Sequence, residues 1–340
     1  MDSANFIVVG ENIHCTRIVL REGKRAIKLD DGSEAVKFDY KGEERLLPIP
    51  SDWGSFSPAF EQGKVKHAAL AIYLAMNGEG EEKKTGEDYL CWMAERQIES
   101  GARFLEVNVD EYANDKKTVL EAMDFTAEFL SARYDTPLSI DSSDPETLRA
   151  GLAKCRQDLG RPLLNSLSLE REEAVGLINE FNAEAIVNAA GRKDMPCGVE
   201  DRMNNLRDII GQITRTGVDV SRLHVDALVM PISTDPMNGS YFMQTTEAAV
   251  KEFPGIHANG GISNVSFGMP CRKLLNMVFA RVCVDEYGLD GGIIDPIQMP
   301  AAEIAGLDPD SEPFQLAKAV LTGEDMFGME FIAASRDGRI

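Results

Sequence analysis

The chain has 340 residues, of which 44% are hydrophobic and 27% are charged. This composition is typical of globular proteins and excludes disordered, collagen-like and coiled-coil chains. The formal net charge of −21 disfavours nucleic acid and membrane surfaces as partners, because their phosphates would repel an acidic protein. A chain of this length suits one (β/α) barrel, a fold of about 250 residues or more.

No stretch reaches the roughly 20 apolar residues that a membrane-spanning helix needs. The first residues include Asp2 and no basic segment ahead of an apolar run, so we expect no secretory signal peptide. The six cysteines are scattered without a Cys-x-x-Cys pair. This pattern favours reduced thiols and therefore a cytoplasmic location.

Short apolar runs that do not alternate predict strands buried on both faces, as in a parallel sheet. From the second run onward they recur at intervals of roughly 20 to 40 residues, the length of one strand, one helix and two turns. In chain order the runs are 6–10, 103–109, 137–141, 162–165, 184–189, 223–230, 255–261 and 291–295.

Helix signals lie between these runs. A helix over 85–100 is predicted to end at Gly101, and Pro145 and Pro270 stand near the starts of two others. We expect the acidic stretch 78–84 to be a mobile loop. Strands alternating with helices in this way predict a (β/α)8 TIM barrel, with residues 1–340 as a single domain.

The connection between the first two strands is too long for one βα unit. Within it, residues 25–47 alternate around two turn sequences typical of β-hairpins, Asp30-Asp31-Gly32-Ser33 and Tyr40-Lys41-Gly42-Glu43. We therefore expect an inserted β-hairpin, or a small three-stranded cap, over residues 15–60 in the first βα loop.

Every predicted strand ends in, or runs into, a carboxylate or amide side chain. Because the carboxyl ends of barrel strands form the reactive edge of this fold, these groups predict a ligand site. In chain order they are Glu11, Glu106 with Asn108 on the same strand, Asp141, Asn165, Asn188, Asp226, Asn264 and Asp295.

Two other interpretations of these residues stay open. A single polar strand end commonly caps a loop, and we expect Glu11, Glu106, Asn188 and Asp295 to support the site from behind. Glu11, Glu106 and Asp141 could together hold Mg²⁺, but no Lys or His base stands opposite them in the sequence. We therefore predict a site without a metal.

Acids and amides in a concave site suit a neutral, planar heterocycle. The two adjacent N–H donors of a 2-amino-4-oxopyrimidine match one carboxylate, and an amide suits the mixed positions beside them. A phosphate ligand would need backbone N–H clusters and basic residues instead. No GxGxxG, GxxxxGK or GxSxG sequence is present, which excludes Rossmann, P-loop and nucleophile-elbow sites.

Five segments follow one another in a recognisable order: Val9-Gly-Glu-Asn-Ile13, Pro137-Leu-Ser-Ile-Asp-Ser-Ser143, Leu164-Asn-Ser166, Leu223-His-Val-Asp226 and Gly261-Ile-Ser-Asn-Val-Ser266. The chain resembles the pterin-binding barrel family, and within it the methyltetrahydrofolate:corrinoid methyltransferases. The resemblance covers residues 6–11 and about 85–300. It is strongest to the methyl-corrinoid:tetrahydrofolate methyltransferases of demethylation systems.

The resemblance implies a role for individual residues. Asp226 would accept hydrogen bonds from the pyrimidine N–H groups, with Asn165 and Asp141 fixing the rest of the ring. Asn264 would reach N5, the nitrogen that carries the methyl group, and is the expected catalytic residue. Glu106 and Phe267 depart from the family pattern. The implied pterin contacts are Asp141, Asn165, Asp226, Gly261, Ser263, Asn264 and Arg272.

The resemblance also implies tetrahydrofolate as a substrate, a corrinoid (cobalamin-type) cobalt as methyl carrier and a homodimer. The cobalamin-binding sequence Asp-x-His-x-x-Gly is absent, since Gly255 replaces the Asp before His257. We therefore expect a partner protein to supply the corrinoid. A dihydropteroate synthase-like enzyme remains an alternative, although the acidic segment 108–111 does not suit its pyrophosphate. The other alternative is a non-catalytic folate-binding module.

Overall fold

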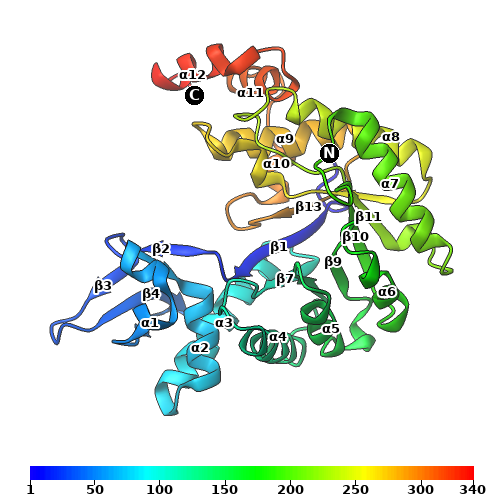
Figure 1. The fold of residues 1–340 in the computed structure, drawn as a ribbon. Helices are drawn as coiled ribbons and strands as arrows, with labels where there is room; N and C mark the ends of the chain where they lie inside the picture. Colours follow the sequence, from blue (N-terminus) through cyan, green and yellow to red (C-terminus); the bar gives the residue numbers. More distant parts are fainter. The chain divides into compact units, whose positions relative to one another are not determined.

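Eight parallel strands form the central sheet of the computed structural model, which describes residues 1–340 (Figure 1). Their order in the sheet is β12-β11-β10-β9-β8-β7-β1-β13. Every residue of β7 and β9 is buried, as expected for strands covered on both faces. The strands are β1 (Ile7–His14), β7 (Phe104–Asn108), β8 (Leu138–Asp141), β9 (Leu163–Leu167), β10 (Glu184–Asn188), β11 (Leu223–Asp226), β12 (His257–Asn259) and β13 (Gly291–Ile294).

The first and last strands of this order lie next to each other. The N–H of Asp290 donates to the carbonyl of Ala258 at 3.2 Å, and that of Ile293 donates to the carbonyl of Gly260 at 2.9 Å. Gly261 also forms a parallel bridge with Ile293. The sheet therefore forms a nearly closed barrel, and the predicted (β/α)8 fold is confirmed.

Helices connect the strands. The side chains of Asp115 and Asp144 cap two of them by accepting hydrogen bonds from the N–H groups of Thr118 and Thr147. None of the helices combines the length and apolar character needed to cross a membrane. They are α2 (His67–Asn77), α3 (Gly80–Glu99), α4 (Lys116–Ser131), α5 (Pro145–Ala153), α6 (Gly176–Glu180), α7 (Gly198–Thr214), α8 (Asn238–Glu252), α9 (Arg272–Tyr287), α10 (Ala301–Ala305), α11 (Glu312–Thr322) and α12 (Met329–Arg336).

Two local predictions are wrong. The acidic stretch 78–84 is largely helical, because α3 begins at Gly80 and places Glu81 and Glu82 in its first turn. There the positive end of the helix dipole favours acidic side chains. The strand predicted over 223–230 ends at Asp226, because Leu228 adopts a left-handed backbone with φ of 65° and leaves the ladder.

The long first connection contains two small antiparallel sheets. β2 (Ile18–Leu20) pairs with β6 (Lys64–Lys66), and β3 (Ala26–Lys28), β4 (Glu34–Tyr40) and β5 (Glu43–Ile49) form a second sheet. A short helix, α1 (Trp53–Phe56), follows β5. The turn between β4 and β5 holds Lys41 and Gly42 at positive φ, as a tight hairpin turn requires.

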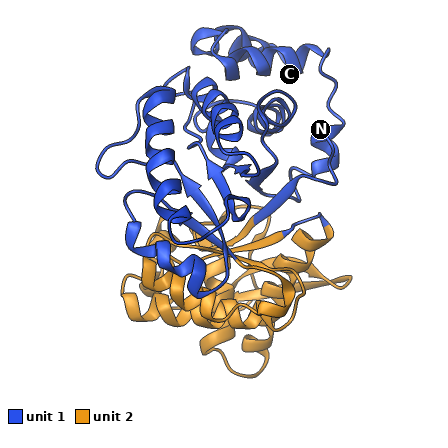
Figure 2. Ribbon diagram, turned by 90° about the vertical axis from the view of Figure 1, so that its right-hand side faces the viewer, with its two compact units in different colours: residues 1–10, 100–103, 163–340 blue, residues 11–99, 104–162 orange.

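The chain divides into two compact units (Figure 2). Unit 1 comprises residues 1–10, 100–103 and 163–340, and unit 2 comprises residues 11–99 and 104–162. The polar strand ends are shared between them. Unit 1 carries Asn165, Asn188, Asp226, Asn264 and Asp295, and unit 2 carries Glu11, Glu106 and Asp141.

Candidate functional site

Asp226 ends β11 in unit 1 and keeps part of its carboxylate accessible. Its Oδ1 accepts a hydrogen bond from the N–H of Leu228 at 2.8 Å, whereas Oδ2 has no partner within the chain. Burial raises the pKa of Asp226 to about 6, and the Leu228 hydrogen bond and the charge of Arg202 oppose that rise. Near neutral pH the group is therefore a carboxylate with one oxygen available to a ligand N–H.

Asn264 lies on η5 (Ile262–Ser266), the short 3₁₀ helix between β12 and α9. Its backbone N–H donates to the carbonyl of Gly261 at 3.1 Å, but its side-chain amide makes no hydrogen bond with the protein. A Cβ atom at Gly261 would lie 2.9 Å from Nδ2 of Asn264, so a larger residue there would displace the amide. The structure thus holds an amide whose donor and acceptor are both free, one strand along from Asp226.

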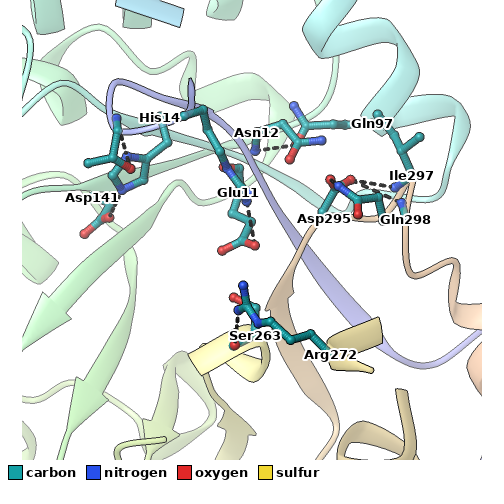
Figure 3. Close-up of polar contacts among 12 residues, drawn as sticks. Glu11, Asn12, His14, Gln97, Asp141, Ser263, Arg272, Asp295, Ile297 and Gln298 are labelled. Carbon is teal, nitrogen blue, oxygen red and sulfur yellow. Dashed lines mark hydrogen bonds and ion pairs between the residues drawn. The ribbon is translucent and has the colours of Figure 1, made fainter. Parts of the chain in front are cut away.

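Arg272, the first residue of α9, braces the turn that carries Asn264. Its Nε donates to Oγ of Ser266 and its Nη2 to the carbonyl of Ser263, both at 3.0 Å. Figure 3 shows the contact between Arg272 and Ser263. Its guanidinium also lies 4.4 Å from the ring centre of Phe267, which is exposed. Three of the implied contact residues, Ser263, Asn264 and Arg272, therefore share one local structure.

The other polar strand ends of unit 1 are engaged locally. Asn188 donates to Oγ of Ser166 at 2.9 Å and accepts from the N–H of Ala190 at 3.0 Å. Asp295 caps the turn that follows β13 by accepting from the N–H of Ile297 and from the side chain of Gln298 (Figure 3). Asn165 is buried within β9. Asn188 and Asp295 thus hold loops in place.

The polar strand ends of unit 2 have partners within that unit. Asp141 accepts from the amide of Asn108 at 2.8 Å, with Nε2 of His14 3.9 Å away. Burial, with the charge of Arg17, lowers the pKa of His14 to about 4, so this imidazole is neutral at physiological pH. Glu11 forms an ion pair with Arg17 at 2.6 Å.

Glu106 is 2% exposed within β7. No group of three or more His, Cys, Asp or Glu side chains is arranged to hold a metal ion, so the geometry lends no support to the Mg²⁺ interpretation of Glu11, Glu106 and Asp141.

Two residues that matter here, Arg202 and Asn259, were not predicted, and a third, Asn108, was noted only as a polar residue of the second strand. Asn108 holds Asp141, and the buried Arg202 acts on Asp226 through its charge. Asn259 ends β12, is fully buried and leaves its Nδ2 without a partner. The sequence carried a signal for each: Asn108 and Asn259 end apolar strands, and Arg202 lies on the apolar face of an amphipathic helix.

Comparisons with known proteins identify relatives of this chain. The model of the family described as "Pterin binding enzyme" matches residues 83–295. The "Methylcorrinoid:tetrahydrofolate methyltransferase" of Eubacterium limosum is 27% identical over 249 residues, which cover 72% of this chain and 86% of that protein.

Solved structures of dihydropteroate synthase share the fold. The enzyme from Xanthomonas albilineans in complex with 7,8-dihydropteroate has a TM-score of 0.52 at 16% identity, covering 65% of this chain and 84% of that one. The same enzyme with 4-aminobenzoic acid has a TM-score of 0.51 at 17% identity, covering 79% and 96%. Likeness at this identity concerns the fold alone. The family match spans most of the barrel, and the chain belongs to the family of pterin-binding enzymes.

Proposed function

We propose that this protein is a methyltransferase that moves a methyl group between N5 of tetrahydrofolate and a corrinoid cobalt carried by a partner protein. The direction we propose is from the methyl-corrinoid to tetrahydrofolate, within a demethylation pathway. The name of the Eubacterium limosum relative supports both the reaction and the two substrates. The structural observation that carries the proposal is the pair of unengaged groups in unit 1, Oδ2 of Asp226 and the amide of Asn264.

Pterin recognition follows from the chemistry of Asp226. Its free oxygen accepts hydrogen bonds from the adjacent N–H groups of the aminopyrimidine, and a charged acceptor strengthens them. Asn165, on the next strand but one, offers an amide for the mixed donor and acceptor edge of the ring. The pterin roles that the resemblance gives to Asp141, Gly261, Ser263 and Arg272 remain predictions.

Asn264 acts at the reacting atom. In the proposed direction the N5 lone pair attacks the methyl carbon and the cobalt–carbon bond breaks, with both electrons remaining on cobalt and the N5 proton leaving to solvent. In this direction the side-chain oxygen of Asn264 accepts a hydrogen bond from N5–H, which orients the N5 lone pair towards the methyl group without placing a fixed charge beside it. In the reverse direction the same amide stabilises charge that develops on N5, an effect worth ~3 kcal/mol, or roughly a hundredfold in rate.

The cellular setting is part of the proposal. All six cysteines are free, which suits a reducing cytoplasm. The partner that supplies the corrinoid and the homodimer remain predictions from the resemblance. Analytical ultracentrifugation of the purified protein tests the dimer.

A spectroscopic assay tests the reaction. The protein is mixed with methylcobalamin, as a stand-in for the partner's corrinoid, and with tetrahydrofolate. We expect the methyl-cobalt absorbance to decrease and 5-methyltetrahydrofolate to form, as identified by mass spectrometry. Pterin binding without turnover, also with added corrinoid proteins, would favour the folate-binding module. Formation of dihydropteroate from a dihydropterin pyrophosphate and 4-aminobenzoate would favour the synthase alternative.

A further inference from the structure

Arg202, on α7, is a buried cation that forms no ion pair. Its side chain is 1% exposed, and its guanidinium donates only to neutral groups. Nε donates to the carbonyl of Ala227 and Nη1 to the carbonyl of Gly198, both at 3.0 Å, while Nη2 lies 3.6 Å from Sδ of Met230. Burying a charge without a carboxylate partner is costly, and such residues are found at functional sites. We therefore asked which groups lie near the guanidinium of Arg202.

One peptide group connects Arg202 to Asp226. The carbonyl of Ala227, which accepts from Arg202, and the N–H of Leu228, which donates to Oδ1 of Asp226, belong to the same peptide unit. In a planar trans peptide these two groups point in opposite directions. The guanidinium therefore fixes one side of the peptide and the carboxylate receives the other.

The side chain of Arg202 holds the Ala227–Leu228 peptide in its observed orientation. Leu228 has φ of 65°, a left-handed conformation that residues with a Cβ atom rarely adopt. A rotated peptide would relieve that conformation and remove the N–H from Asp226. The hydrogen bond from Arg202 to the Ala227 carbonyl opposes the rotation.

The charge of Arg202 also reaches Asp226. On the flanking strands, the residues in register with Asp226 are the neutral amides Asn188 and Asn259. The positive charge of Arg202 favours the ionised form of Asp226 and so opposes the rise in its pKa that burial causes. Arg202 is itself influenced by Asp226, Asp235, Cys197 and the ring of Tyr241, which lies 5.4 Å away.

We propose that Arg202 is a positioning residue for the pterin site: through the Ala227–Leu228 peptide it fixes the carboxylate of Asp226 and leaves Oδ2 available to the ligand. The proposal rests on the proposed function for the identity of the ligand. The effect of Arg202 on Asp226 does not depend on the proposed methyltransferase function, because it can be measured in the unliganded protein.

The test replaces Arg202 by Met, which keeps an unbranched apolar stem and removes the charge and the donors. In the unliganded protein, NMR of the carboxyl carbons should show the titration midpoint of Asp226 rising by roughly one pH unit. The dissociation constant of tetrahydrofolate at pH 7.5 should rise about tenfold. The kcat at saturating tetrahydrofolate should change much less, because Asn264 is untouched. Arg202→Lys, which retains the charge, should return the midpoint towards the wild-type value.

Arg222→Met is the matched control. Arg222 precedes β11 and also donates to backbone carbonyls, those of Ala183 and Ile178. Its replacement should lower stability without moving the Asp226 midpoint.

An unchanged Asp226 midpoint in Arg202→Met would overturn the proposal and leave Arg202 a structural brace. If Arg202→Met does not fold, Arg202→Gln serves the same test, since it is neutral and keeps a hydrogen-bond donor. A midpoint that stays at the wild-type value in that variant also overturns the proposal. If the midpoint moves but the wild-type protein binds no tetrahydrofolate, the proposed function fails while the coupling of Arg202 to Asp226 stands.

Discussion

Asn188 and Asn264 are both amides near strand ends, but they differ in their hydrogen-bond partners. Asn188 is buried, and its side-chain amide donates a hydrogen bond to Ser166 and accepts one from the N–H of Ala190. Asn264 makes no side-chain hydrogen bond with the protein, although its backbone is held within η5. An unsatisfied but accessible amide in a rigid turn is preorganised for a ligand, because binding needs no internal hydrogen bond to break.

Asn264→Ala should lower kcat by about a hundredfold or more, because it removes the hydrogen bond at N5. Its effect on tetrahydrofolate affinity should be smaller, since Asp226 remains. Steady-state rates at saturating tetrahydrofolate, together with binding calorimetry, measure both effects. Asn188→Ala is the control: it should lower stability by about 1 kcal/mol and affect kcat far less. An unchanged kcat in Asn264→Ala would remove the catalytic assignment.

Asp226→Asn should weaken tetrahydrofolate binding by ~2 kcal/mol, because a charged acceptor is lost. Calorimetry that returned equal affinity for the variant and the wild type would refute the proposed pose.

The pKa of Asp226 gives its role a pH signature. Since that pKa is about 6, we expect affinity for tetrahydrofolate to be constant above this pH and to fall towards tenfold per unit below it, because a proton then competes with the ligand. The folded-state pKa lies above the unfolded value. Protonation therefore favours the folded state, and the destabilising effect of this buried carboxylate is present above pH 6 and disappears towards pH 4. Asp226→Asn should flatten the binding profile over this range.

At the scale of elements, η5 shows how a short turn sets the position of a functional group. The residue before it, Gly261, closes the turn and also bridges to β13 through Ile293. Any side chain at this position would contact the amide of Asn264, because its Cβ atom would lie 2.9 Å from Nδ2. The glycine is therefore needed for a close approach and not for an unusual φ.

Gly261→Ala should lower kcat about tenfold to a hundredfold by displacing the Asn264 amide, with the fold retained. Circular dichroism checks the fold and the methyl-transfer assay checks the rate. Gly176→Ala is the control, because a Cβ atom there meets nothing within 4 Å. Equal rates for Gly261→Ala and the wild type would contradict the role that we give to the turn.

The end of strand β11 was predicted wrongly from the sequence, and the structure shows why. The apolar run continues from Leu223 to Met230, so local composition predicts a longer strand. The strand stops at Asp226 because Leu228 turns to a left-handed backbone, held by Arg202 through the Ala227 carbonyl. Arg202 belongs to α7, which is distant from β11 in the sequence, so local sequence patterns do not reveal this contact.

At the scale of the molecule, the inserted three-stranded sheet is seated on α3. Phe38 is 3% exposed and packs edge-on against Tyr89 and Trp92, with ring centres 4.8 and 5.8 Å apart. We propose that the inserted segment 15–60 unfolds together with the single domain predicted for residues 1–340. Calorimetry should then show one transition, and a separate early transition of the sheet would contradict this.

Phe38→Ala should lower the free energy of unfolding by ~3 kcal/mol, because it leaves a cavity within this aromatic cluster. Chemical denaturation measures the change. Phe327→Ala is the control: Phe327 is 70% exposed, so its removal should alter stability little. A loss of less than about 1 kcal/mol in Phe38→Ala would show that the sheet packs weakly on α3.

The sequence by itself determined the order of strands and helices, since burial patterns and turn residues act between near neighbours in the chain. It also placed Asp226 at the end of a strand and Asn264 in the segment that follows one. Only the tertiary structure decided which polar strand ends are already satisfied: Asn188 and Asp295 are bonded within the protein, whereas Asn264 is not. It also decided that Arg202 of α7 meets the peptide after β11. The physical reason is that hydrogen-bond partners are chosen by proximity in space, which the three-dimensional packing of distant segments creates.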